Sequence, residues 1–126
     1  MNEVWNLRLA WVWILAGLVA GSVQGLFFHR ADWLGGYASW PRRMTRLGHV
    51  SFFGTGVINL LAVLTVRALE VRMPSAAALL LALGALGMPL VCYAAAFVRP
   101  ARHLFVVPVL SLVSGVAVLV FAGLWP

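Results

Sequence analysis

Apolar residues in this chain form four long runs, separated by short segments that contain arginine. The runs cover about residues 9–28, 47–66, 74–98 and 104–125. Each run has about 20 residues, which is the length that a helix needs to cross the hydrocarbon core of a bilayer. A barrel strand would instead alternate apolar and polar residues over about 10 positions. The pattern therefore predicts an all-α integral membrane protein.

The short segments between the last three runs favour helices that lie next to each other in opposite directions. We expect residues 1–126 to form a single membrane domain, an antiparallel four-transmembrane-helix bundle whose longest loop is 29–46. Small residues allow close helix packing in lipid, and polar ones can form bonds between helices. The candidate packing positions are Gly17, Gly21, Gly25, Gly56 and Asn59.

Proline and glycine positions refine these elements. Pro89 and Pro108 lie inside the third and fourth runs, where each removes a backbone donor and is expected to kink its helix. In the loop 29–46, the Gly35-Gly36 pair and Pro41 predict a segment without regular helix.

Composition supports the membrane assignment. Apolar residues make up 63% of the 126 residues and charged residues 10%, against about 25% charged in an ordinary soluble domain. A soluble fold of this length cannot bury so much apolar surface. Cys92 is the only cysteine, which excludes a disulfide-stapled module. The first run also has features of a signal peptide, but it continues to Phe28, which favours a true membrane helix.

The charges predict an orientation. All nine basic residues are arginine, and with three acids the formal net charge is +6. Six arginines fall in the loop 29–46 and the turn 99–103, and three fall on the side of the termini. The positive-inside rule makes the loop side cytoplasmic. Both termini then lie on the non-cytoplasmic side of a membrane, which we take to be a bacterial inner membrane. Arginines confined to the interfaces do not indicate a nucleic-acid partner.

The loop 29–46 combines aromatic rings, which favour headgroup depth, with arginines that can meet lipid phosphates. Docking to a neighbouring subunit is a compatible alternative. The residues predicted to face lipid or a partner are Trp33, Tyr37, Trp40, Arg42, Arg43 and Arg46.

Three histidines are the most informative polar residues, because four spans place His29, His49 and His103 at the same membrane face. Three interpretations stay open. His49 and His103 can hold a b-type haem from two helices. The three histidines, with or without Cys92, can hold copper or zinc. Alternatively, they are ordinary interfacial residues that hydrogen-bond headgroups or loop carbonyls. No CxxCH, HExxH or paired-cysteine motif supports a metal.

The sequence predicts no catalytic residue. No acid lies in the middle of a span, which disfavours an ion-coupled transporter, and no nucleophile motif is present. We therefore expect a non-catalytic accessory or structural subunit of a larger membrane complex, such as an energy-transducing one, with lipids and other membrane subunits as partners. A haem-binding electron-transfer protein is the alternative. The segment 46–61, RLGHVSFFGTGVINLL, has the character of a functional motif but indicates no family.

Overall fold

A computed structural model describes residues 3–125 and contains four long helical stretches. They are α1 (Glu3–Phe27), α2 (Trp40–Ala68), α3 (Ser75–Phe97) and a fourth stretch (Arg99–Leu124) whose central part is α4 (Val106–Val118). All four are long and apolar enough to cross a membrane. No strand occurs within residues 3–125. The prediction of an all-helical chain with four such helices is confirmed.

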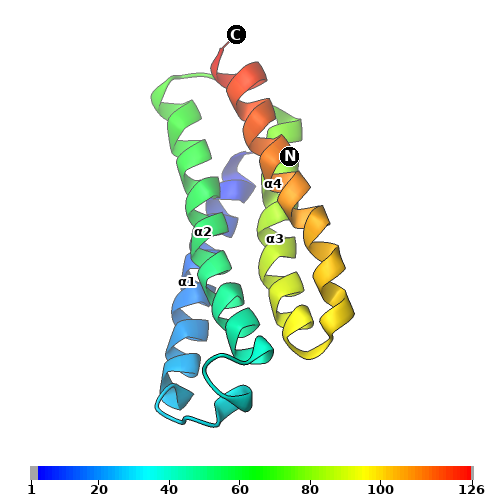
Figure 1. The fold of residues 1–126 in the computed structure, drawn as a ribbon. Coiled ribbons are helices and arrows are strands. Elements are labelled where there is room, and N and C mark those ends of the chain that lie inside the picture. The colour runs from blue at the N-terminus through cyan, green and yellow to red at the C-terminus, as the bar shows by residue number, and fades with distance from the viewer. Residues whose placement is uncertain (1–2, 126) are drawn as a thin grey trace.

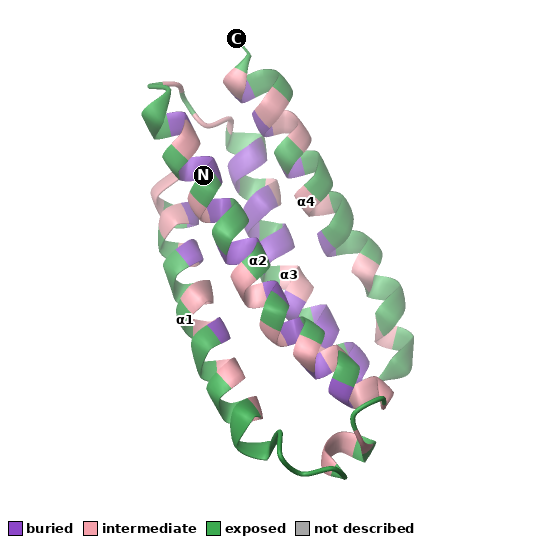
Figure 2. Cartoon of the chain, turned by 60° about the vertical axis from the view of Figure 1, so that its left-hand side comes forward, coloured by how far each residue is buried: buried purple, intermediate pink, exposed green. Residues whose placement is uncertain are grey.

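The helices are arranged around α2 and α3. In Figure 1 the chain runs down α1, up α2, down α3 and up α4. α2 packs against both α1 and α3, whereas α4 packs mainly against α3. Buried residues therefore concentrate on α2 and α3 (Figure 2). Half of the most apolar part of α3 is buried, against 11% for α1 and 17% for the fourth stretch, so the two outer helices expose wide apolar faces.

The second helix begins earlier than the apolar run indicated. It starts at Trp40, and Ser39 caps it by accepting a hydrogen bond from a first-turn amide. The prediction that Pro41 breaks the helix is wrong, because proline is well tolerated in the first turn. Gly35 and Gly36 do break regular helix, because their φ angles are 86° and 98°, a conformation that residues with an L side chain rarely adopt.

The two internal prolines differ in position. Pro89 lies inside α3, as expected. Pro108 lies in the first turn of α4, which begins at Val106, where the 3-10 turns of Arg99–Phe105 pass into α-helix. It thus lies inside the fourth stretch, as expected. Its ring is fully buried and would lie 3.1 Å from a Cβ atom at Gly87.

Glycines on α1 and α2 form notches that receive side chains or backbone of the facing helix. Gly17 lies under the ring of Phe53, and Gly21 lies under the imidazole of His49. In the other direction, a Cβ atom at Gly56 would lie 3.2 Å from the carbonyl oxygen of Ala10. The α1–α2 interface therefore depends on small residues in both helices. Gly25 differs, because a Cβ atom there would have no neighbour within 4 Å.

Glycine notches also join α3 to α4. Leu112 of α4 packs into the notch at Gly84, and Leu81 of α3 packs into the notch at Gly115. A Cβ atom at Gly115 would lie 3.0 Å from the backbone nitrogen of Leu81. The two backbones thus approach too closely for a larger residue.

Candidate functional site

Two asparagines join three helices at the end of the molecule that carries the termini. Asn6 of α1 and Asn59 of α2 are both fully buried. The Asn6 side chain donates to Asn59 Oδ1 and to the carbonyl oxygen of Ala78, each at 2.8 Å. Asn59 donates in turn to the carbonyl oxygen of Leu81 at 3.2 Å. A buried amide without partners is costly, so these bonds fix the relative positions of α1, α2 and α3.

Trp13 compensates for the proline inside α3. Pro89 has no N–H, so the carbonyl oxygen of Ala85, four residues earlier, lacks its usual helical partner. The indole nitrogen of Trp13 in α1 donates to that oxygen at 2.7 Å. An aromatic side chain of one helix thus satisfies the backbone defect of another.

Two further bonds lie nearer the arginine-rich end. Gln24 of α1 donates to the hydroxyl of Tyr93 at 2.9 Å, which links α1 to α3. Trp40, at the start of α2, donates to the carbonyl oxygen of Ala95 at 2.7 Å. That oxygen belongs to the last turn of α3, where carbonyls lack helical partners. Polar contacts between α1, α2 and α3 therefore occur both near the termini and near the arginine-rich end.

Arg42 is a buried arginine at the arginine-rich end of the molecule, with only 2% of its surface exposed. It donates to the carbonyl oxygens of Phe28 at 2.9 Å and Arg30 at 3.2 Å. Its guanidinium also lies 5.1–5.4 Å from the centroids of the rings of Phe28, Trp33 and Tyr37. The Arg42 side chain thus binds the loop of its own chain, and its contact with lipid or a partner stays a prediction. The side chain caps the C-terminal end of α1, where a cation is favourable, and holds the loop closed.

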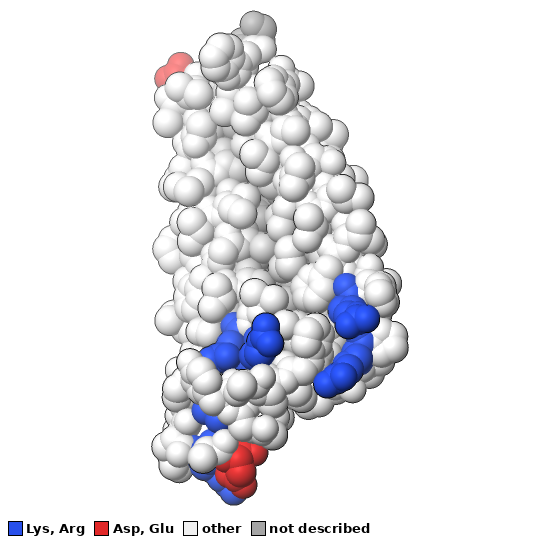
Figure 3. All heavy atoms as spheres, in the orientation of Figure 1, with Lys and Arg blue, Asp and Glu red and all other residues white. Residues whose placement is uncertain are grey.

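The remaining loop residues are more accessible. Tyr37 and Arg43 are exposed, and Trp33 and Arg46 are half-buried. The Arg46 guanidinium lies 4.4 Å from the centroid of the Tyr37 ring. Figure 3 shows basic side chains gathered at this lower end of the visible face.

The three histidines occupy different surroundings. His29 and His103 are exposed, in the α1–α2 loop and in the 3-10 segment before α4. His49 is half-buried at the α1–α2 interface, where its ring lies against Gly21 and its centroid is 5.4 Å from that of the Phe53 ring. Its imidazole thus faces α1, while α4 packs on the far side of α3.

This arrangement bears on the cofactor hypotheses. Within residues 3–125, no three His, Cys, Asp or Glu side chains lie close enough together to hold a metal ion. Cys92 is buried in α3, whereas His29 and His103 are exposed. The His49–His103 haem hypothesis stays a prediction; His49 lies at the α1–α2 interface, whereas His103 is exposed before α4.

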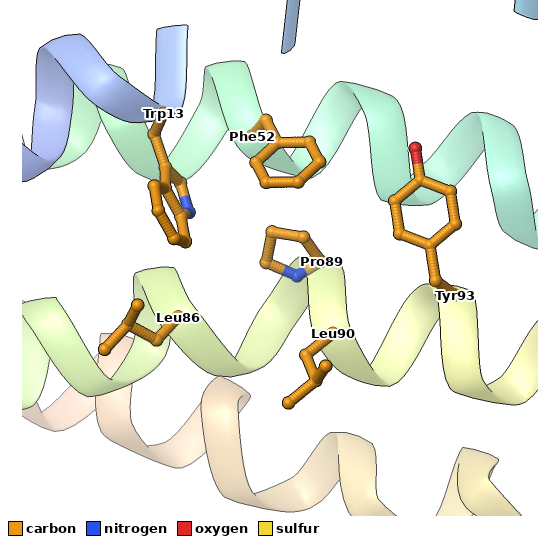
Figure 4. A pocket seen from close by; sticks show the side chains of 6 residues that line it. All are labelled: Trp13, Phe52, Leu86, Pro89, Leu90 and Tyr93. Atoms are coloured by element: carbon orange, nitrogen blue, oxygen red, sulfur yellow. The ribbon is translucent and has the colours of Figure 1, made fainter. Parts of the chain in front are cut away.

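Two hollows of different character lie beside these contacts. One of about 340 Å³ is apolar and lies between α1, α2 and α3 (Figure 4); its lining residues are Trp13, Phe52, Leu86, Pro89, Leu90 and Tyr93. The polar atoms of Trp13 and Tyr93 are already hydrogen-bonded elsewhere. The other hollow, of about 230 Å³, lies between α1 and α2 and includes Arg46 and His49.

Comparison with known proteins gives no assignment. The chain matches no family model, no curated protein and no solved structure. Any function must therefore be argued from the contacts described above.

Proposed function

We propose that this protein is a membrane-embedded structural subunit of a larger membrane complex. The supporting observation is the use of its interior polar groups. Asn6, Trp13, Gln24, Asn59 and Arg42 all bind backbone or side chains of other segments of the chain. Ionisable residues inside a membrane usually mark substrate or ion pathways. These mostly uncharged side chains instead hold segments of the chain together.

The outer helices provide surface for a partner. α1 and α4 each expose large apolar side chains along their length, such as Leu15 and Leu18 on α1 and Leu110 and Val113 on α4. In a bilayer these faces can meet lipid or a neighbouring transmembrane helix without cost. The connections outside the long helices are short, which leaves little mass for converting a soluble substrate.

Membrane insertion as an antiparallel bundle, with the arginine-rich end in the cytoplasm, is part of the proposal. The structure supports it through the grouping of the α1–α2 loop and the α3–α4 turn at one end (Figure 1). These two segments, with the first two turns of α2, carry six of the nine arginines. The positive-inside bias then places this end on the cytoplasmic side, and a bacterial inner membrane is the setting that we propose.

Gentle solubilisation from the source membrane followed by native electrophoresis tests the assembly. We expect the 13.7-kDa chain to migrate in a larger band together with at least one further membrane protein in a fixed ratio. Migration as a lone monomer under conditions that preserve known complexes of the same membrane would contradict the proposal.

Tryptophan substitutions on exposed faces locate the interface. Val19→Trp on α1 and Val113→Trp on α4 each add bulk at positions that are 56% and 61% exposed. We expect one of them to abolish co-migration, because added volume cannot fit into a packed interface. Leu61→Trp on α2, also 56% exposed, is the matched control and should leave the complex intact.

A further inference from the structure

Two neighbouring hollows share Arg46 and Val50 at the arginine-rich end of α2. The first, of about 230 Å³, is lined by Gly21, Gln24, Gly25, Phe28, Arg46, His49 and Val50. The second, of about 380 Å³, lies along α2 and is lined by Arg43, Met44, Arg46, Leu47 and Val50. Arg46 therefore stands at the border between the two, with an open space on each side.

The two arginines of these hollows carry unneutralised charge. Within residues 3–125 the ion pair that forms joins Arg67 to Glu3, at the other end of the molecule. Arg43 is exposed, and Arg46, three residues later on the same face of α2, rests on Tyr37. Arg42, in contrast, is bound by loop carbonyls. Arg43 and Arg46 are therefore free to bind an anion together.

Apart from the arginines, the surface that lines the two hollows is mainly apolar. Leu47 and Val50 are 45% and 57% exposed. On α1, Gly25 leaves its position open, because a Cβ atom there would meet nothing within 4 Å. The α1–α2 hollow then continues to Gly21 and His49, further from the arginine-rich end. The combination is a cationic rim followed by an apolar channel between two helices.

We propose that these two hollows form a binding site for one anionic phospholipid. Its phosphate lies between Arg43 and Arg46, and an acyl chain follows Leu47 and Val50 past Gly25. Basic pockets between membrane helices are suited to such headgroups. A free phosphate would leave the apolar channel unused. The inference rests on the membrane insertion proposed above.

Native mass spectrometry of the full chain, released from nanodiscs, tests the site. The nanodiscs contain phosphatidylglycerol and phosphatidylcholine in equal amounts with the same acyl chains. We expect one phosphatidylglycerol molecule to be retained preferentially. Arg43→Gln with Arg46→Gln should lower its retention by about thirtyfold. Arg99→Gln with Arg102→Gln removes the same charge from the same end of the molecule and should change retention by less than about twofold.

A second pair of variants leaves every charge in place. Gly25→Leu fills the channel at a position with no neighbour to displace, so the fold should persist while retention falls. Gly54→Leu on α2, where a Cβ atom also meets nothing within 4 Å, is the matched control and should retain the lipid. The double-arginine variant also removes the contact between Arg46 and Tyr37. The glycine pair keeps that contact, so it tests the site even where the double-arginine variant misfolds.

Three results would overturn the proposal. They are equal retention of the two lipids, equal losses in the two double-arginine variants, and displacement of the lipid by inorganic phosphate alone. The second would indicate a diffuse electrostatic effect and the third a simple anion site. Failure of membrane insertion is distinguishable, because the chain would then not be recovered in nanodiscs at all.

Discussion

At the scale of single residues, polar side chains in the apolar helices serve mainly to satisfy backbone groups. Trp13 binds the carbonyl that Pro89 leaves without a partner, and Trp40 and Arg42 bind carbonyls at the ends of α3 and α1. In the hydrocarbon core of a bilayer no water would replace a missing partner, so with the proposed insertion the bond of Trp13 protects a group that would otherwise be costly. The tryptophans and Arg42 thus act as caps for other helices.

Replacing Trp13 by phenylalanine tests this role. An aromatic side chain remains, although it is smaller, and the carbonyl oxygen of Ala85 loses its donor, so we expect the free energy of unfolding to fall by at least about 1 kcal/mol. Reversible unfolding in mixed micelles measures the change. Trp11→Phe, at a 59% exposed position of the same helix, is the control and should stay within about 0.5 kcal/mol of the parent. Equal effects of the two substitutions would exclude the capping role.

At the scale of elements, the position of segment 46–61 in the bundle explains its unusual composition. It is the part of α2 that lies between α1 and α3. His49, Phe53 and Gly56 meet α1, while Gly48 receives the ring of Tyr93 from α3 and Asn59 bonds to both neighbours. The mixture of small, aromatic and polar residues is therefore what a central helix with two different partners requires.

The glycine notches on α1 give a prediction at this scale. Gly21→Ala places a methyl group against the His49 ring, so we expect it to weaken the α1–α2 interface by about 1–3 kcal/mol. Gly25→Ala adds the same methyl group in open space and should be neutral or slightly stabilising, because alanine favours helix. Thermal unfolding of the two variants in the same detergent compares them directly. A Gly21→Ala protein as stable as Gly25→Ala would show that the notch is not required.

The sequence was informative about the elements and less so about the contacts between them. Long apolar runs identified four helices, since length and hydropathy are local properties. The start of α2 was missed because Pro41 has one meaning inside a helix and another in its first turn. Asn6 and the Trp13–Ala85 bond were also missed, although the proline inside α3 was a signal that some donor must reach its free carbonyl. Which helix supplies that donor depends on the three-dimensional arrangement.

At the scale of the whole molecule, topology follows from the proposed insertion and can be measured. In a Cys92→Ala background, single cysteines at Ala31, Ala101 and Glu70 sample the two ends. We expect the first two to react with a membrane-impermeant maleimide only from the cytoplasmic side and the third only from the opposite side. Labelling of positions 31 and 101 from different sides would contradict a four-span topology.

The four helices are not held in the bundle by the same kinds of contact. None of the interhelical side-chain hydrogen bonds found in residues 3–125 involves α4, which contacts α3 through glycine notches such as Gly84 and Gly115. Shape alone thus retains the last helix. Most positions of α4 can therefore exchange one apolar residue for another, provided that the residues at the notches stay small. The first three helices must also keep their hydrogen-bond donors and acceptors. A relative of this protein should therefore be sought by the polar pattern of residues 6–95, because the final span would carry almost no recognisable signature.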